Sequence, residues 1–157
     1  MVNSSLKSTQ DCISVQVLEN ADFENIRKLL EPVSDLYPDF DTWFNFRVRR
    51  QYPQQRIVIA AERDSTIVGV AILKKTIDEH KICTLFVHKN YRGQKVGSEL
   101  LNEAVNILDG KDISITVSEE RNSSLKPLLE KKGFQLKDAK LGYYRPNTTE
   151  YFYVLTK

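Results

Sequence analysis

Short segments of alternating hydrophobic and polar residues recur along the chain, and this alternation is typical of β-strands with one buried face. It predicts strands at residues 13–17, 56–62, 67–73, 81–87, 113–117, 134–137 and 150–155. Asp64 and Ser65 separate the second strand from the third and predict a β-hairpin. Strict alternation in the fourth strand would place Cys83, Leu85 and Val87 on one face. The last two strands are expected to pair across the loop between them.

Four further segments carry hydrophobic residues at the three- and four-residue spacing of an amphipathic helix. They run from Asn20 or Asp22 to Pro32, over residues 41–51, from Leu100 to Gly110, and over residues 122–132. Pro32 is expected to end the first of them. Pro127 is compatible with the last helix only in its first turn. Helices placed between runs of strands predict an α/β (α+β) fold, with a mixed sheet that carries helices on its faces.

Length and composition indicate one globular domain. The chain has 157 residues, of which 41% are hydrophobic and 28% are charged. We expect a polar N-terminal extension over residues 1–12 and a single domain over residues 13–157. Residues 1–12 lack the apolar core of a secretory signal, and no apolar run approaches the ~20 residues that cross a bilayer. A cytoplasmic protein without a membrane partner is therefore expected.

Charge and cysteine content exclude further classes of function. Lysine and arginine number 23 against 21 aspartate and glutamate, and this small excess is unlike that of a nucleic-acid-binding protein. Only Cys12 and Cys83 are cysteines, and only two histidines are present, so no metal site is expected. Cys83 is interpreted as a buried core thiol rather than a nucleophile.

One segment carries recognisable chemistry, because a predicted buried strand, a loop with Gly93 and Gly97, and an amphipathic helix follow one another directly. The start of a helix exposes unpaired N–H groups and the positive end of its dipole, so it binds anions. Arg92 and Lys95 add positive charge to this loop. Its spacing differs from the P-loop and from the dinucleotide fingerprint. The segment predicts a diphosphate cradle, with a simple strand-to-helix turn as the alternative.

The loop sequence Tyr91-Arg-Gly-Gln-Lys-Val-Gly-Ser resembles the acetyl-CoA signature of the GNAT N-acetyltransferases, Arg/Gln-x-x-Gly-x-Gly/Ala. Arg92 and Gly97 match its two ends, whereas Lys95 stands where the middle glycine is usual. Further on, Asn122 is followed eleven residues later by Gly133 and Phe134, which resembles the second motif of the family. The resemblance implies a mixed, mostly antiparallel central sheet of about seven strands flanked by about four helices.

The same resemblance implies acetyl-CoA as co-substrate and assigns residues to it. These residues are Leu85, Phe86, Val87, Arg92, Gly93, Gln94, Lys95, Val96, Gly97, Ser98 and Asn122. Among them, the N–H group of Val87 would polarise the thioester carbonyl, as in an oxyanion hole. Asn122 would face the pantetheine arm.

In such enzymes a neutral amine attacks the thioester directly, so a base takes up a proton and an acid protonates the departing thiolate. The usual tyrosine acid lies seven residues after the asparagine of the second motif, where this chain has Leu129. Tyr143 and Tyr144 are the nearest candidates to replace it, and of these we take Tyr144. For the base we take Glu119, with Glu79, His80 and Glu120, or a water relayed by one of the four, as alternatives.

Two groups of residues keep two interpretations each. Trp43, Phe44 and Phe46 line an acceptor pocket or pack a helix against the sheet. Four arginines form a solvated helix face, which is favoured, or receive an acidic acceptor or an RNA. They are Arg47, Arg49, Arg50 and Arg56.

The leading hypothesis is transfer of the acetyl group of acetyl-CoA to a primary amine of a small molecule or peptide. A non-catalytic acyl-CoA-binding sensor or interaction module is the alternative, because Leu129 replaces the usual acid. An enzyme that acts on aminoacyl-tRNA is ranked last, since the net charge is only +2. The acceptor, the acyl-chain preference and the oligomeric state stay open, with a homodimer as one option.

Overall fold

A computed structural model describes residues 12–157, so that most of the expected extension over residues 1–12 lies outside the described part. Seven strands form one sheet in the order β1-β2-β3-β4-β5-β7-β6, and only β4 and β5 are parallel neighbours. The strands are β1 (Ser14–Val17), β2 (Arg56–Arg63), β3 (Thr66–Lys75), β4 (His80–Val87), β5 (Ile113–Ser118), β6 (Gln135–Leu141) and β7 (Thr149–Leu155). The predicted mostly antiparallel sheet of about seven strands is confirmed.

Helices account for most of the remaining chain. They are α2 (Phe23–Leu29), α3 (Glu31–Ser34), α4 (Phe40–Trp43), the π-helical turn η1 (Phe44–Val48), α5 (Arg49–Gln51), the 3₁₀ turn η2 (Lys89–Tyr91), α6 (Val96–Ile107) and α7 (Glu119–Lys132). Asp22 caps α2, since its side chain accepts a hydrogen bond from the N–H of Asn25. The first predicted helix ends at Leu29, just before Pro32 as expected, but Pro32 does not stop helix formation there. It lies in the first turn of α3, where its missing N–H group costs no hydrogen bond.

The last helix begins earlier than predicted. Because α7 starts at Glu119 rather than Asn122, Pro127 lies in its interior and not in its first turn. The carbonyl of Ser123, four residues before the proline, therefore lacks its usual intrahelical donor. Ser123 is exposed, so water can replace that donor.

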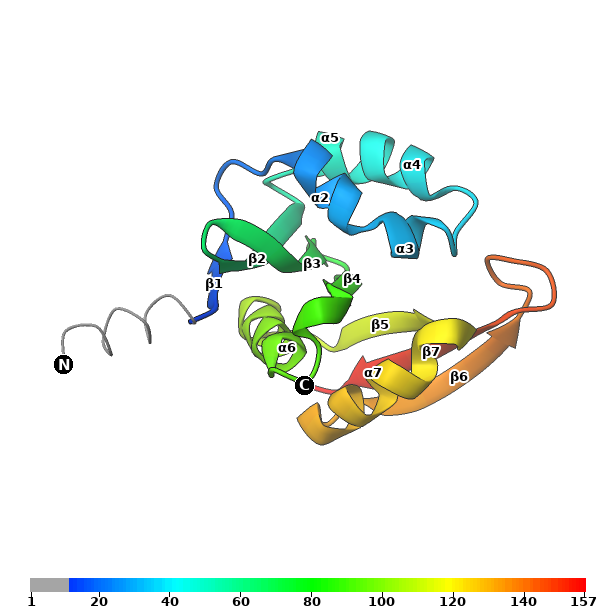
Figure 1. Ribbon diagram of the computed structural model, residues 1–157. Helices are drawn as coiled ribbons and strands as arrows, with labels where there is room; N and C mark the ends of the chain where they lie inside the picture. The colour runs from blue at the N-terminus through cyan, green and yellow to red at the C-terminus, as the bar shows by residue number, and fades with distance from the viewer. Residues whose placement is uncertain (1–11) are drawn as a thin grey trace.

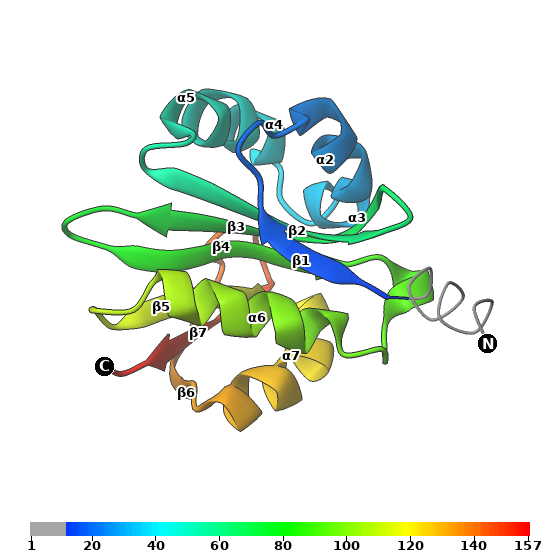
Figure 2. The same ribbon diagram turned by 90° about the vertical axis from the view of Figure 1, so that its left-hand side faces the viewer.

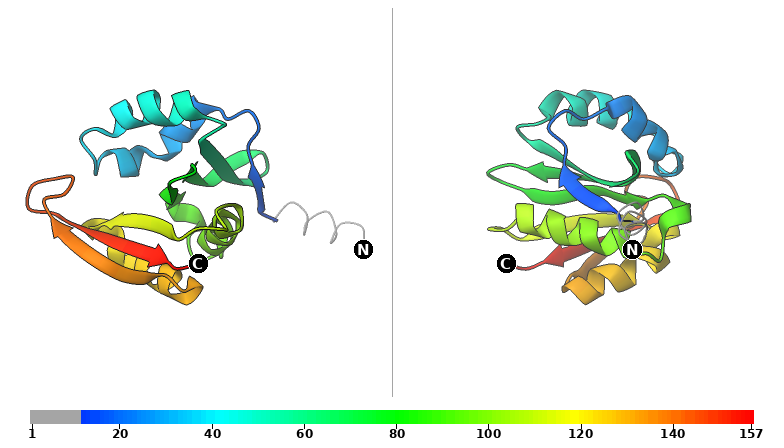
Figure 3. Two further views of the ribbon diagram at one scale, coloured as in Figure 1. Left: turned by 180° about the vertical axis from the view of Figure 1, so that it is seen from behind. Right: turned by 60° about the vertical axis from the view of Figure 1, so that its left-hand side comes forward.

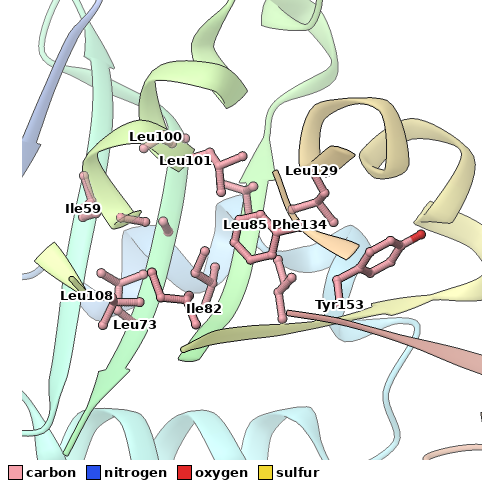
Figure 4. Packing of buried hydrophobic residues seen from close by; sticks show 14 of the residues in the cluster. Ile59, Leu73, Ile82, Leu85, Leu100, Leu101, Leu108, Leu129, Phe134 and Tyr153 are labelled. Atoms are coloured by element: carbon pink, nitrogen blue, oxygen red, sulfur yellow. The ribbon is translucent and has the colours of Figure 1, made fainter. Parts of the chain in front are cut away.

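The helices cover both faces of the sheet, as Figures 1 and 2 show. The region from α2 to α5 lies on one face and contributes Ile26, Leu30 and Phe44 to a core that includes Val70 and Phe86 of the sheet. On the other face, α6 and α7 bury leucines against β2 to β5 and β7. Figure 4 shows this second core, in which Leu101 of α6 and Leu129 of α7 point toward Leu85 and Phe134.

Strands β4 and β5 pair only at their beginnings. Their register joins His80 to Ile113, Lys81 to Ser114 and Ile82 to Ile115, and no pair follows. Beyond these residues β4 runs on to Val87 and β5 to Ser118. The two halves of the sheet diverge there, as Figure 3 shows from behind. The divergence leaves backbone N–H and C=O groups of β4 without partners from β5.

A β-bulge changes which side chains of β4 share a face. Ile72 pairs with Thr84 and Leu73 pairs with Ile82, so Cys83 is an extra residue without a partner in β3. The prediction that Cys83 shares a face with Leu85 is therefore wrong. Cys83 packs with the core under α2 to α5, whereas Leu85 belongs to the core under α6 and α7.

Among residues 12–157, no helix combines the length and the apolar character needed to cross a membrane.

Candidate active site

A cavity of about 580 Å³ lies beside the glycine-containing loop, and we call it the loop cavity. Its walls come from the end of β4, the loop, the first turn of α6 and the exposed side of α7. The lining residues are Leu85, Val87, Tyr91, Arg92, Gly93, Lys95, Val96, Gly97, Ser98, Glu120, Arg121, Ser124, Leu125 and Leu128. The loop cavity thus joins an apolar wall to a cationic loop.

The loop and the start of α6 leave backbone N–H groups without partners beside this cavity. Gly93 has a φ of 79° and Lys95 a φ of 66°, so both lie in the left-handed region. Lys95 is the N-cap residue of α6, and no side chain caps this helix. The first N–H groups of α6, from Val96 to Ser98, therefore have no intrahelical acceptor and are available to an anion. The left-handed conformation explains why a glycine is usual at position 95.

The structure brings most of the predicted cofactor residues together around the loop cavity. Leu85, Val87, Arg92, Gly93, Lys95, Val96, Gly97 and Ser98 line it. Phe86, Gln94 and Asn122 are not among the lining residues. The Phe86 ring is buried beneath the guanidinium groups of Arg92 and Arg121, at 5.5 and 5.6 Å from its centroid. The Asn122 Oδ1 atom accepts a hydrogen bond from the Tyr153 hydroxyl at 2.5 Å.

A second cavity, of about 400 Å³, lies on the other side of the divergence between β4 and β5. We call it the aromatic cavity because Tyr37, Phe40, Trp43 and Tyr144 line it. The further lining residues are Val33, Asp39, Arg56, Lys74, Glu79, Lys81, Cys83, Thr84, Leu85, Ile115, Thr116, Arg121 and Leu125. It therefore combines aromatic side chains with several cations.

The two cavities meet where β4 and β5 diverge. Leu85, Arg121 and Leu125 line both of them. An N–H group of the Arg121 guanidinium donates a hydrogen bond to the Leu85 carbonyl, across the point at which the strands have separated. Burial lowers the pKa of Arg121 to about 10, which leaves it charged at neutral pH. The two cavities thus share a wall at Leu85, Arg121 and Leu125.

A buried carboxylic acid lies next to this junction. Glu150 of β7 is 3% exposed, pairs with Ser118 in the sheet, and accepts a hydrogen bond from the Tyr37 hydroxyl at 3.0 Å. Burial raises the pKa of Glu150. Burial and the neighbouring Glu150 also raise the pKa of Tyr37, so its hydroxyl keeps its proton at neutral pH. Sequence analysis missed this pair because 113 residues separate its members.

The predicted catalytic residues lie in different surroundings. Tyr144 lines the aromatic cavity, and its ring packs edge-on against Tyr37 with centroids 5.5 Å apart. Burial raises the pKa of Tyr144. Glu119 lies in the first turn of α7, where it is exposed and accepts a hydrogen bond from the Thr149 N–H at 3.1 Å. It lines neither cavity.

The alternative bases already have partners. Glu79 forms an ion pair with Lys74 at 2.8 Å, which lowers its pKa. Glu120 binds Arg145 through two hydrogen bonds, of 2.6 and 2.7 Å, and its pKa is lowered by them. The Nδ1 atom of His80 lies against the Leu108 carbonyl, on the face covered by α6.

The position of the family's usual acid is a core position in this chain. Leu129 is 0% exposed and lies within the core of Figure 4, away from the lining of either cavity. Among the aromatic residues of the second predicted helix, Trp43 lines the aromatic cavity, Phe44 is buried in the core, and Phe46 is exposed. Among residues 12–157, no cluster of three or more histidine, cysteine or acidic side chains suitable for a metal is present.

Comparison with known proteins agrees with this architecture. No curated protein matches the chain. Among solved structures, the ribosomal-protein-S18-alanine N-acetyltransferase of Escherichia coli superposes with a TM-score of 0.74 at 16% identity, over 92% of this chain and 94% of the other. PaiA N-acetyltransferase of Thermoplasma acidophilum, in complex with coenzyme A, superposes with a TM-score of 0.70 at 19% identity, over 93% and 99%.

The acetyltransferase (GNAT) family matches residues 20–134, which include β4, the loop, α6 and α7. These are the elements that form the loop cavity and its junction with the aromatic cavity. The chain belongs to the GNAT family of acetyl-CoA-dependent acetyltransferases.

Proposed function

We propose that this protein transfers the acetyl group of acetyl-CoA to the primary amine of a small molecule or peptide by direct attack. One observation carries the proposal: two cavities of different chemistry meet at Leu85, where β4 and β5 diverge. The loop cavity is suited to a phosphate-bearing cofactor, and the aromatic cavity is suited to an acceptor. Their junction is then the place at which an amine meets a thioester.

The loop cavity has the features that acetyl-CoA requires. The free N–H groups of the first turn of α6 would hold the pyrophosphate, with Arg92 and Lys95 adding charge. Gly97 leaves this surface without a side chain. The apolar wall of Leu85, Leu125 and Leu128 suits the pantetheine arm. The unpaired edge of β4 would bind that arm and polarise the thioester carbonyl, for which the N–H of Val87 remains our assignment.

The proton of the attacking amine needs an acceptor. We assign this role to Tyr37 and Glu150: the Tyr37 oxygen receives the amine proton while its own proton passes to Glu150 Oε2, to which it is already hydrogen-bonded. Burial raises the pKa of Glu150 toward neutral pH, and a carboxylate with such a pKa is a better base. Tyr144, which lines the same cavity and keeps its proton, would protonate the departing thiolate. Neither Glu119 nor Glu150 lines a cavity, but Glu150 is hydrogen-bonded to Tyr37, which does, whereas Glu119 accepts from the Thr149 N–H and is therefore less suited.

Calorimetric titration with acetyl-CoA, with free CoA and ATP as controls, tests the first step. We expect binding of acetyl-CoA and none of ATP. Release of free thiol over a panel of primary amines then tests the chemistry. Binding without turnover of any amine would favour the non-catalytic acyl-CoA binder. The observation that supports this alternative is that Leu129, at the usual acid position, is buried. Absence of acetyl-CoA binding would refute both.

A further inference from the structure

We propose that the acceptor carries a carboxylate as well as the reacting amine, and that Arg56 and Lys81 bind this carboxylate at the end of the aromatic cavity remote from the junction. The inference rests on the proposed function and adds the class of acceptor to it.

The strand register places three cations in one row across the sheet. Arg56 of β2 pairs with Lys74 of β3, and Lys74 pairs with Lys81 of β4. Neighbouring strands lie about 4.8 Å apart, so the backbones of the outer two are about 10 Å from one another. All three side chains line the aromatic cavity. Three like charges on one wall favour an anion.

Arg56 is the most unusual member of the row, because it is only 5% exposed and its side chain hydrogen-bonds to neutral groups. Its Nε donates to the Gln51 side-chain oxygen at 2.8 Å, and its Nη1 to the Cys83 sulfur at 3.1 Å. Its guanidinium also lies 5.9 Å from the centroid of the Trp43 ring. Burial raises the pKa of the Cys83 thiol, so this sulfur is not a thiolate counter-ion.

A buried guanidinium without a carboxylate is costly unless a counter-charge reaches it. No acid of the cavity forms an ion pair with Arg56, although the Glu79 carboxylate lies near enough to interact with its charge. Glu79 is paired with Lys74, and Asp39 is exposed at the end of the segment that connects α3 to α4. Within residues 12–157, neither Arg56 nor Lys81 forms an ion pair. Two of the three cations of the row are thus left for a ligand.

The distance to the junction sets the length of the acceptor. Lys81 and Leu85 are four residues apart on β4, which amounts to at most about 13 Å along the strand. An α-amino acid, whose amine and carboxylate are adjacent, spans only a small part of this separation. A longer ω-amino acid, met by the extended side chain of Lys81, or an extended peptide can bridge it. Tyr37, Phe40 and Trp43 would cover the apolar part between the two ends and exclude water from it.

The test compares acceptors that differ only in the carboxylate. The values of kcat/KM are measured for 6-aminohexanoate, its methyl ester, hexylamine and glycine with saturating acetyl-CoA. We expect 6-aminohexanoate to exceed the ester and hexylamine about tenfold or more, which is the worth of hydrogen bonds between charged groups. Glycine should be poor, because it is too short.

Variants identify the residues involved. Lys81→Gln should lower the ratio of kcat/KM for 6-aminohexanoate to kcat/KM for hexylamine about tenfold. Glu79→Gln, which releases Lys74 from its ion pair, should raise kcat/KM for 6-aminohexanoate. Lys75→Gln is the matched control: it removes the same charge from β3, but its Nζ binds the Ile107 carbonyl, outside the aromatic cavity. Arg56→Gln is informative only in a variant that keeps its folded-state circular dichroism, so Lys81→Gln carries the test.

The outcomes separate the two proposals. Equal kcat/KM for 6-aminohexanoate and hexylamine, with both acetylated, would overturn the carboxylate site and keep the acetyltransferase. Equal losses in Lys81→Gln and Lys75→Gln would also overturn it, because the effect would then be one of net charge. Failure to acetylate any of these amines, or any amine of the wider panel, would instead refute the proposed function.

Discussion

Substitution at Gly97 separates binding of acetyl-CoA from stability of the fold. A Cβ atom added at Gly97 would lie 3.4 Å from Leu128 Cδ2 and 3.8 Å from Val87 Cγ2, which is ordinary van der Waals contact. Alanine is favoured over glycine in a helix by about 0.5–1 kcal/mol. Gly97→Ala should therefore raise the melting temperature by about 1–4 °C. It should bind acetyl-CoA nearly as the wild type does.

Gly97→Glu should fold equally well, because a carboxylate near the N-terminus of α6 is favoured by the helix dipole. It nevertheless directs a negative charge into the loop cavity. A phosphate charge about 4 Å from this carboxylate costs about 4 kcal/mol near a protein surface. Salt screens part of this repulsion, so we expect a loss of affinity of about 100-fold or more.

Calorimetry gives the affinity and differential scanning fluorimetry gives the melting temperature, both at the same ionic strength. Gly97→Gln is the matched control for the added volume, because it differs from Gly97→Glu in charge alone, and Gly97→Ala tests the Cβ atom. Wild-type affinity in Gly97→Glu would refute the placement of the pyrophosphate in the loop cavity. A loss of melting temperature in parallel with affinity would show instead that the glycine is needed for the fold.

Three further predictions concern Lys95, Glu150 and Leu129. Lys95→Gly and Lys95→Ala both remove the Lys95 charge and should weaken acetyl-CoA binding to a similar extent. Only Lys95→Gly should also relieve the left-handed backbone at φ 66° and raise the free energy of unfolding by up to about 1 kcal/mol. Glu150→Gln should lower kcat yet keep or raise the melting temperature at pH 8. The reason is that burial raises the pKa of Glu150, so the native state holds more protons than the unfolded state above the ordinary glutamate pKa, and wild-type stability falls as pH rises through the raised pKa. A melting temperature of Glu150→Gln well below wild type at pH 8, with the difference closing in acid, would contradict this sign. Leu129→Ala should lower the free energy of unfolding, measured in urea, by about 2–5 kcal/mol, because Leu129 is fully buried. The folded fraction should still bind acetyl-CoA, because Leu129 lines neither cavity. Loss of binding by the folded variant would place Leu129 in the site.

Much of the loop cavity could be predicted because its parts are close together in the sequence. The end of β4, the loop and the start of α6 form one continuous segment, and local rules decide its structure. The free N–H groups at the start of a helix follow from the hydrogen-bond geometry of any helix. Alternation of hydrophobic residues is likewise a local signal, and it predicted the seven strand segments; the mostly antiparallel order of the sheet was implied by the family resemblance.

Local rules failed where a boundary or a register depends on distant residues. Hydrophobic spacing began the last helix at Asn122, but the structure extends it to Glu119, and Pro127 thereby moves into its interior. Alternation placed Cys83 with Leu85, but pairing with β3 inserts a bulge that turns Cys83 to the other core. A single extra residue exchanges the two faces of a strand, and no pattern within β4 announces it.

The aromatic cavity and the chemistry at its junction belong to the tertiary structure alone. Tyr37 and Glu150 meet across 113 residues, and Arg56 joins the cavity from β2 rather than from the arginine-rich helix beside it. The sequence by itself determined the loop and helix start that we assign to the cofactor, because one continuous segment carries that chemistry. Only the folded sheet decided which side chains line the aromatic cavity, because β4 and β5 pair no further than Ile82 and Ile115.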